Sequence, residues 1–230
     1  LRQYPKTIDD PSNPFVLLER NAQRTYVAQS GLVGRDGIDT GERASYRTEK
    51  SFYQLTDQKP LQVALKYSDD RSGISVTKSF YFEPNSHTIT VSYDIYNSGN
   101  TKIQLTPFAQ LKRDSSPAPV ATDAGMGMQP FLGSATTQPD QRFSKFDFDD
   151  MADDPFKADL VGGWVAILQH YFVSAWIPAP DQTYRFRTRQ TQSGFNIIGY
   201  TGPSLSVAAD DTARVTNQLY VGPKNQKRLA

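Results

Sequence analysis

The sequence predicts an all-β protein built from two packed sheets, and three observations carry this prediction. Most segments alternate apolar and polar residues, aromatic residues make up 12% of the chain, and fifteen Gly and fifteen Pro supply turns. Alternation places apolar side chains on one face of a strand, and aromatic residues favour such half-buried surfaces. The 230 residues show no repeat at a fixed period, so a single domain over 1–230 is expected.

Four consecutive strands are predicted in the first half of the chain. Their sequences are, in order, LQVALKY from Leu61, ISVTKSFYFEP, HTITVSYDIY and IQLTPFAQLK. Turn signals separate them, including Asp69-Asp70 before Gly73 and the run from Asn97 to Asn100. This spacing predicts a meander of antiparallel strands.

The second half begins with a change of composition near Asp114. A stretch rich in Pro, Gly, Ala and Ser predicts a long loop, and an acidic segment from Arg142 to Leu160 follows it. Strand patterning resumes at Trp164 and continues to the C-terminal region. Pro is favoured at the first helical position, so Gly222-Pro223 before KNQKRLA predicts a short helix over 222–230.

The longest apolar stretch is GGWVAILQHYFVSAWIP, residues 162–178. A membrane-spanning helix needs about 20 predominantly apolar residues, whereas Gln169, His170 and Ser174 interrupt this stretch. Its β-branched and aromatic residues, with Gly and Pro at its ends, instead predict a strand that is buried on both faces.

Composition excludes several classes of function. There is no cysteine, which excludes disulfides and thiolate metal sites. The net charge is +1, which gives no reason to expect a nucleic-acid partner. The acidic run of Asp147, Asp149, Asp150, Asp153 and Asp154 lacks the spacing of an EF-hand, so we expect a solvated loop or a surface for a basic partner, and no metal or other cofactor.

Motifs give no support for an enzyme. The only histidines, His87 and His170, lie in strand-like runs, and no GxSxG element occurs. The glycines of SGLVGRDG, which begins at Ser30, match neither phosphate-binding pattern, so turns explain them better. We therefore predict no catalytic residues.

Three arginines, Arg185, Arg187 and Arg189, alternate along one predicted strand and share one face. They either bind an anion or an acidic partner, or they are ordinary solubilising charges on an exposed sheet. The second interpretation is preferred on the sequence alone.

Four blocks resemble, in order, the large periplasmic domain of the YidC family of bacterial membrane protein insertases. They are VAQSGLVGRDG (27–37), GGWVAILQHYFVSAWIP (162–178), NIIGY (196–200) and LYVGPKNQ (219–226). Weaker similarity fills the intervening sequence, so the resemblance covers nearly the whole chain.

The resemblance implies a two-sheet β-supersandwich, a fold also seen in galactose mutarotase, and a domain in the periplasm of a protein anchored in the inner membrane. It also implies that the family's first strands precede this chain. It implies contacts with the Sec translocon, SecDF and SecYEG, and with nascent membrane proteins. Because fold does not carry function, the mutarotase likeness by itself predicts no activity.

Two sets of site residues follow as hypotheses. Within 128–177, Phe143, Phe146 and Phe148 alternate with charges and precede Asp149 and Asp150. The phenylalanines either anchor a partner, with these carboxylates beside them, or pack onto the sheet.

The alternative is a cleft that binds an extended peptide or a sugar-like ligand, with Tyr184, Arg185 and Phe186 as its candidate residues. At the other end of the chain, Lys224, Lys227 and Arg228 either lie near anionic headgroups or belong to a solvated helix.

Overall fold

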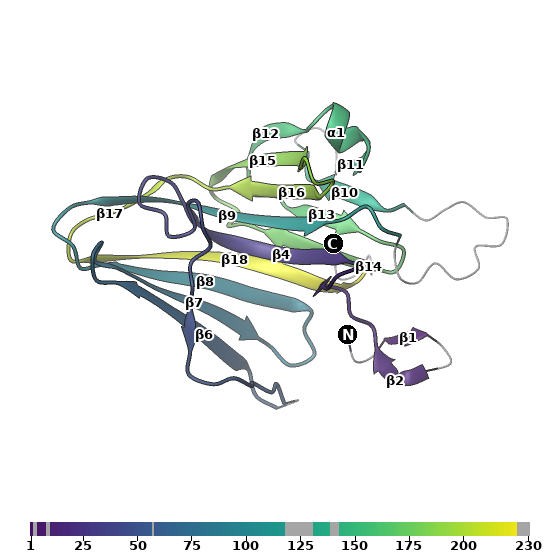
Figure 1. The fold of residues 1–230 in the computed structure, drawn as a ribbon, viewed down its shortest axis with the longest axis horizontal. Coiled ribbons are helices and arrows are strands. Elements are labelled where there is room, and N and C mark those ends of the chain that lie inside the picture. The colour runs from purple at the N-terminus through teal and green to yellow at the C-terminus, as the bar shows by residue number, and fades with distance from the viewer. Residues whose placement is uncertain (2–3, 8–9, 57, 118–130, 139–142, 225–230) are drawn as a thin grey trace.

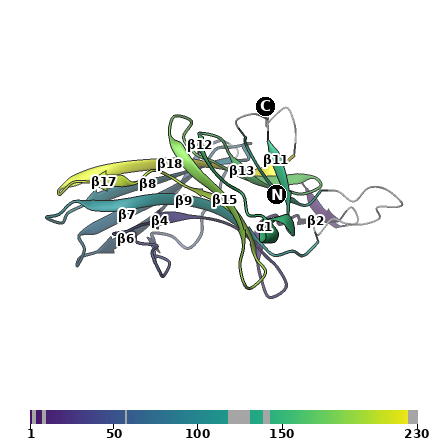
Figure 2. The same ribbon diagram turned by 90° about the horizontal axis from the view of Figure 1, so that it is seen from above.

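The computed structural model is a sandwich of two antiparallel β-sheets, as the sequence predicts (Figure 1). The described residues are 1, 4–7, 10–56, 58–117, 131–138 and 143–224. Viewed from above, most strands of both sheets run along the long axis of the molecule (Figure 2).

The larger sheet has nine strands, each antiparallel to its neighbours. From edge to edge they are β11 (Ser144–Asp147), β10 (Gly133–Thr136), β13 (Val165–Leu168), β14 (Phe172–Ile177), β18 (Asp211–Pro223), β8 (Thr88–Asn97), β7 (Ile74–Phe82), β6 (Leu61–Asp69) and β5 (Arg47–Thr48). The predicted meander of the first half corresponds to β6, β7 and β8, while the fourth predicted strand crosses to the other sheet.

The smaller sheet packs against the larger one. Its order is β12 (Lys157–Val161), β15 (Thr183–Gln190), β16 (Asn196–Thr201), β9 (Ile103–Arg113), β4 (Thr25–Val33) and β3 (Glu19–Arg20), with β17 (Leu205–Val207) also paired to β9. Pro107 has no N–H to donate, and it lies between the part of β9 that pairs with β17 and the part that pairs with β16.

Two short elements complete the fold. The strands β1 (Pro5–Thr7) and β2 (Asp10–Pro14) pair with each other apart from the sandwich (Figure 1). The single-turn helix α1 (Asp150–Asp153) lies near β11 and β12, at the corner opposite β6. No helix of the described residues is long and apolar enough to cross a membrane.

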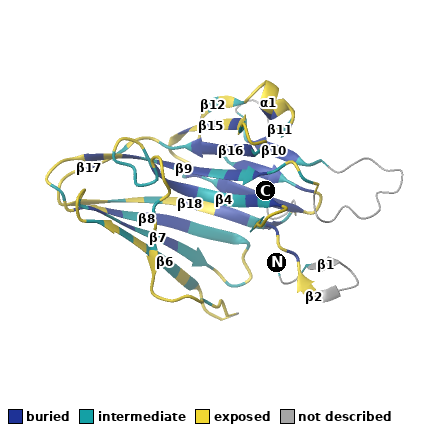
Figure 3. Cartoon of the chain, viewed as in Figure 1, coloured by how far each residue is buried: buried dark blue, intermediate teal, exposed yellow. Residues whose placement is uncertain are grey.

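The core lies between the sheets and follows the alternation of the strands. Along β9 the inward residues Ile103, Leu105, Ala109 and Leu111 are buried, as predicted. Figure 3 shows buried residues along the central strands and exposed residues around α1 and in the end loops. Trp176 on β14 is among the largest fully buried side chains, at 1% exposure.

Among the hydrogen bonds that join the two sheets across this core, three are made by buried aromatic side chains. They run from Trp176 Nε1 to the Gln110 carbonyl oxygen (3.1 Å), from the Tyr93 hydroxyl to Ser30 Oγ (2.8 Å), and from the Tyr200 hydroxyl to Asn217 Oδ1 (2.9 Å). Each satisfies a polar group that burial would otherwise leave unpaired. They also fix how one sheet lies over the other, because each bond needs its two strands at one relative position.

Residues 162–178 form two strands, so the prediction of one long strand is wrong. β13 and β14 make a hairpin, and the amide of Gln169 donates to the Phe172 carbonyl oxygen at its turn (2.9 Å). His170 and Tyr171 are exposed in this turn, which explains the polar residue at position 170, whereas Gln169 and Ser174 are buried. The burial prediction is confirmed for both strands, since nearly every residue of each is buried.

The C-terminal prediction is wrong where the structure describes it. Gly222 and Pro223 end β18, paired with Val173 and Phe172 of β14, so no helix begins at them. Pro tolerates this position because it is the last residue of the strand. Residues 225–230, with Lys227 and Arg228, lie outside the described part.

We expect Trp176→Ala to lower the free energy of unfolding by about 3–5 kcal/mol, because it leaves a cavity and removes the bond to Gln110. Urea denaturation of the 230-residue chain measures this loss. Val161→Ala, at a side chain that is 68% exposed, is the control and should change stability by less than about 0.5 kcal/mol. Equal losses for the two variants would contradict this description of the core.

Candidate functional site

The outer face of the smaller sheet carries rows of side chains in register. β15 presents Arg185, Arg187 and Arg189 outward, and all three are exposed. Beside them, in matching order, β16 places Thr201, Gly199 and Ile197, and β9 places Phe108, Gln110 and Lys112. The alternation that buries the even-numbered residues of β15 therefore directs all three arginines to the same open surface.

This surface is hollowed. A cavity of about 400 Å³ is lined by residues of β4, β9, β15 and β16, together with Arg43 from the loop that follows β4. Gly199 lies in the middle of these rows and lets β16 pack closely against β9, since any Cβ there would lie 2.5 Å from the Ala109 carbonyl oxygen. Next to Gly199, Gln110 Nε2 donates to Gln29 Oε1 (2.8 Å). The glycine and the two amides thus form a floor, and the arginines form a wall.

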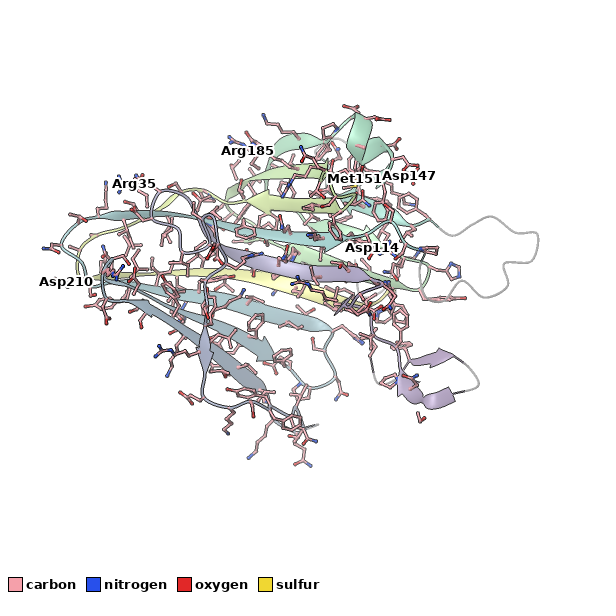
Figure 4. All side chains as sticks on the ribbon, in the orientation of Figure 1. Arg35, Asp114, Asp147, Met151, Arg185 and Asp210 are labelled. Carbon is pink, nitrogen blue, oxygen red and sulfur yellow. The ribbon has the colours of Figure 1, made fainter. Side chains whose placement is uncertain are left out.

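The surface is strongly basic, and we call it the basic groove. Its cations are Arg43, Lys112, Lys157, Arg185, Arg187 and Arg189. Asp159 of β12 is the carboxylate in register with Arg185, at 3.1 Å, and both side chains are more than half exposed. Such an exposed pair is weak, so it leaves most of the positive potential in place. Figure 4 labels Arg185 at the outer side of the sandwich.

Two cations are held by aromatic rings. The Arg43 guanidinium lies 5.1 Å from the centre of the Phe108 ring, and Lys112 Nζ lies 3.9 Å from that of Phe195. These contacts orient both charges. Arg43 also lies 3.6 Å from the buried Asp39 carboxylate, which accepts bonds from the amides of Leu32 and Ala44.

Below β4 lies a second, buried polar cluster. Lys78 Nζ donates to the Ser30 carbonyl oxygen (3.1 Å), while Tyr93 donates to Ser30 Oγ. Burial lowers the pKa of Lys78 from 10.5 to about 8, and the Asp39 carboxylate opposes this shift. Burial also raises the pKa of the Tyr93 hydroxyl. The cluster supports β4 from inside the sandwich.

The three residues predicted for a cleft do not come together. Arg185 lines the basic groove, but Tyr184 and Phe186 point the other way into the core, at 4% and 0% exposure. Both pack on Tyr200, with ring centres 5.2 and 5.6 Å apart. The expectation that they line the same site as Arg185 is wrong because neighbouring residues of a strand face opposite sides.

The second predicted site is a corner formed by β11 and α1. Its three phenylalanines differ in how far their side chains are exposed. Phe143 is 43% exposed, with its ring centre 6.2 Å from that of Trp164. Phe146 is half-buried against Phe156. Phe148 is only 7% exposed, and its ring lies 5.6 Å from the Arg113 guanidinium.

Of the two alternatives for the phenylalanines, Phe148 therefore follows the second and packs onto the sandwich, because α1 turns the chain back at this point. Met151 of α1 is buried and accepts a hydrogen bond from Ser134 Oγ (2.9 Å), which attaches the helix to β10. Asp149 and Asp150 remain exposed. The accessible part of the corner consists of Phe143, Asp149 and Asp150, which we call the acidic corner. Residues 128–130 and 139–142 of the predicted surface lie outside the described residues.

The histidines occupy separate places. His87 packs near Tyr220, with ring centres 6.2 Å apart, and the exposed His170 packs on Tyr171. Within the described ranges, no group of three His, Asp or Glu side chains is placed to hold a metal ion.

The family model for the YidC periplasmic domain matches residues 1–230. The chain belongs to the YidC periplasmic domain family. Two curated relatives, each named membrane protein insertase YidC, agree with this. One from Marinomonas sp. (strain MWYL1) is 42% identical over the whole chain, and one from Pseudomonas aeruginosa is 40% identical. The resemblance noted from the four sequence blocks is confirmed.

The chain covers 41% and 43% of those two relatives, which is about two fifths of their length. Solved structures with the same fold include the GH36 alpha-galactosidase AgaA from Geobacillus stearothermophilus, with a TM-score of 0.55 at 9% identity over 84% of this chain and 30% of the other. A galactose mutarotase related enzyme from Lactobacillus acidophilus has a TM-score of 0.51, also at 9% identity. This match covers 84% of this chain and 76% of the enzyme. These likenesses confirm the predicted fold and carry nothing about activity.

The lowered pKa of Lys78 makes stability depend on pH. Between pH 8 and 10.5 the unfolded chain binds more protons than the folded one, so the free energy of unfolding rises with pH. The shift of Lys78 corresponds to a rise of about 2 kcal/mol from pH 7.5 to 9.5, and Lys78→Met should remove this contribution. Urea denaturation at several pH values gives the measurement.

Measurements stop below pH 10 because several buried tyrosines with raised pKa values, Tyr93 among them, act in the opposite direction as the pH approaches 10. Lys66→Met, at an ammonium that is 62% exposed, serves as the control and should keep the rise. If Lys78→Met kept the full rise, burial of this amine would not be its cause.

Proposed function

We propose that this chain is a non-catalytic interaction domain in the periplasm. In this proposal it belongs to an inner-membrane insertase and contacts the Sec translocon, SecYEG with its SecDF subunits, while nascent membrane proteins are inserted. The insertase name of the relatives supports this proposal. Within the chain, the single observation that carries it is the acidic corner, where an exposed aromatic side chain stands beside exposed carboxylates.

The acidic corner has the composition of a contact site. Phe143 is one of a few large apolar side chains in the described residues that are more than a third exposed, and exposed aromatics in a polar rim often anchor partners. Asp149 and Asp150 add negative charge beside it. We therefore expect a partner surface that presents a pocket for Phe143 and basic residues around it.

The backbone at this corner adds a second means of contact. β11 is the outermost strand of the larger sheet in the described chain and is four residues long. One side of such a strand has unpaired N–H and C=O groups, which a partner strand can complete. Lys145 and Asp147 on β11 point to the same outer side, and they discourage pairing with a second copy of the same strand.

The basic groove is a second candidate for function. In this alternative the domain binds an extended peptide or a sugar-like ligand in the groove. The cavity of about 400 Å³ is the observation that favours it. Arg185 is the one predicted cleft residue that lines it.

A photo-crosslinking amino acid at position 143 of the full-length insertase is expected to form an adduct with SecDF, because Phe143 stands exposed at the acidic corner. Position 52, where Phe52 is 73% exposed and lies outside this corner, provides the control and should give no adduct. Mass spectrometry of the crosslinked bands identifies the partner. Adducts with SecDF from both positions, or from neither, would count against this contact.

Charge reversal tests the carboxylates. Asp149→Lys with Asp150→Lys should reduce co-purification of SecDF several-fold, because it replaces attraction by repulsion. The matched control, Asp70→Lys with Glu83→Lys, makes the same change of net charge at exposed positions on other turns. Equal recovery from the two double variants would refute the role of the acidic corner.

A further inference from the structure

We propose that the basic groove binds an extended, acidic polypeptide segment. The groove lies on the outer face of the smaller sheet, whereas the acidic corner lies at the edge of the larger one. The proposal develops the second candidate above and is independent of the SecDF contact.

Charge is the first argument. Six cations meet on one face of a chain whose net charge is only +1. Asp159 is the carboxylate in register with them, and it faces Arg185 alone. Arg187 and Arg189 form no ion pair with a carboxylate of the described residues, and Lys157 lies beside Arg187 across the β12–β15 pair. A concave surface lined by one sign of charge attracts ligands of the opposite sign.

Spacing is the second argument. The three arginines occupy alternate positions of one strand, so their Cα atoms repeat at about 6.7 Å. An extended peptide with an acidic residue at every second position has the same repeat, and all its carboxylates point to one side. Each carboxylate can then meet one guanidinium in a bidentate pair.

The floor of the groove is the third argument, and it favours a peptide over a membrane surface. Gln29 and Gln110 share one hydrogen bond, which leaves a Gln29 amide donor and the Gln110 carbonyl oxygen able to bind a peptide main chain. Phe108 and Ile197 supply apolar contacts beside the central Gly199. A flat layer of lipid headgroups would contact the arginine tips but would not enter the hollow.

The test measures binding of a fluorescein-labelled peptide in which Glu alternates with Thr and Val, by fluorescence anisotropy with the 230-residue chain. We expect saturable binding that weakens at about 0.5 M NaCl, and no binding of the matching peptide with Lys in place of Glu. Arg187→Glu with Arg189→Glu should weaken binding by at least about tenfold. Circular dichroism checks that the variants are folded.

The matched control is Arg71→Glu with Lys102→Glu, two exposed cations on turns away from the groove. It makes the same change of net charge and should leave the Kd within about twofold if the arginines act locally. If the control variant lost as much affinity for the acidic peptide, the effect would be one of net charge alone, and the proposed binding site would be wrong.

A gain of binding provides an independent check. Asp159→Asn removes the carboxylate that pairs with Arg185, so the acidic peptide should bind about two- to threefold more tightly. Unchanged or weaker binding would contradict the proposed contact with Arg185.

Vesicles that contain phosphatidylglycerol test the other source of negative charge. If the chain floats with such vesicles through Arg187 and Arg189 but does not bind the acidic peptide, the occupant is a membrane and the proposal is wrong. If neither probe binds through these arginines, the groove has no anionic ligand of either kind. Neither result affects the crosslinking experiment at position 143.

Discussion

The pairing of β18 on both of its sides holds the larger sheet together. One side of β18 follows β8 from Asp211 opposite Asn97 to Tyr220 opposite Thr88, and the other side pairs with β14 near the C-terminal end of the strand. The strands β5 to β8 come from the first half of the chain, and β10, β11, β13 and β14 come from the second half. Without β18 these would be two separate small sheets. The core and both candidate sites therefore depend on this one strand.

The two surfaces use the sandwich in different ways. The basic groove needs a rigid floor, and the bond from Trp176 to the Gln110 carbonyl group fixes β9, the strand that forms its centre. The acidic corner needs only α1 to be attached to the sandwich. The buried side chain of Met151, which accepts the hydrogen bond from Ser134, provides this attachment. Both proposed contacts therefore use rows of side chains or a strand edge.

Period-two patterning predicted the fold class and the buried face of β9 because a half-buried strand shows its two faces directly in the sequence. It failed at residues 162–178, where both faces of β13 and β14 are buried and the hairpin turn at His170 has no Gly or Pro to mark it. The arginine row was visible in the sequence, but its neighbours were not. Gly199 and Gln110 lie beside it only through strand pairing between distant segments, and Arg43 reaches it from the loop that follows β4. The sequence also could not distinguish Phe148 from Phe143, because Phe148 is buried only by the turn of the chain at α1.

The position of β18 in the chain has a consequence for how the domain is made. Every other strand of the larger sheet precedes it in the sequence, so during synthesis β8 and β14 wait with unpaired edges until the last strand arrives. Contacts between segments this far apart in the sequence form slowly, and open strand edges are prone to wrong pairing. A chain released before residue 211 would carry two incomplete half-sheets, and such a product is a natural substrate for chaperones and proteases.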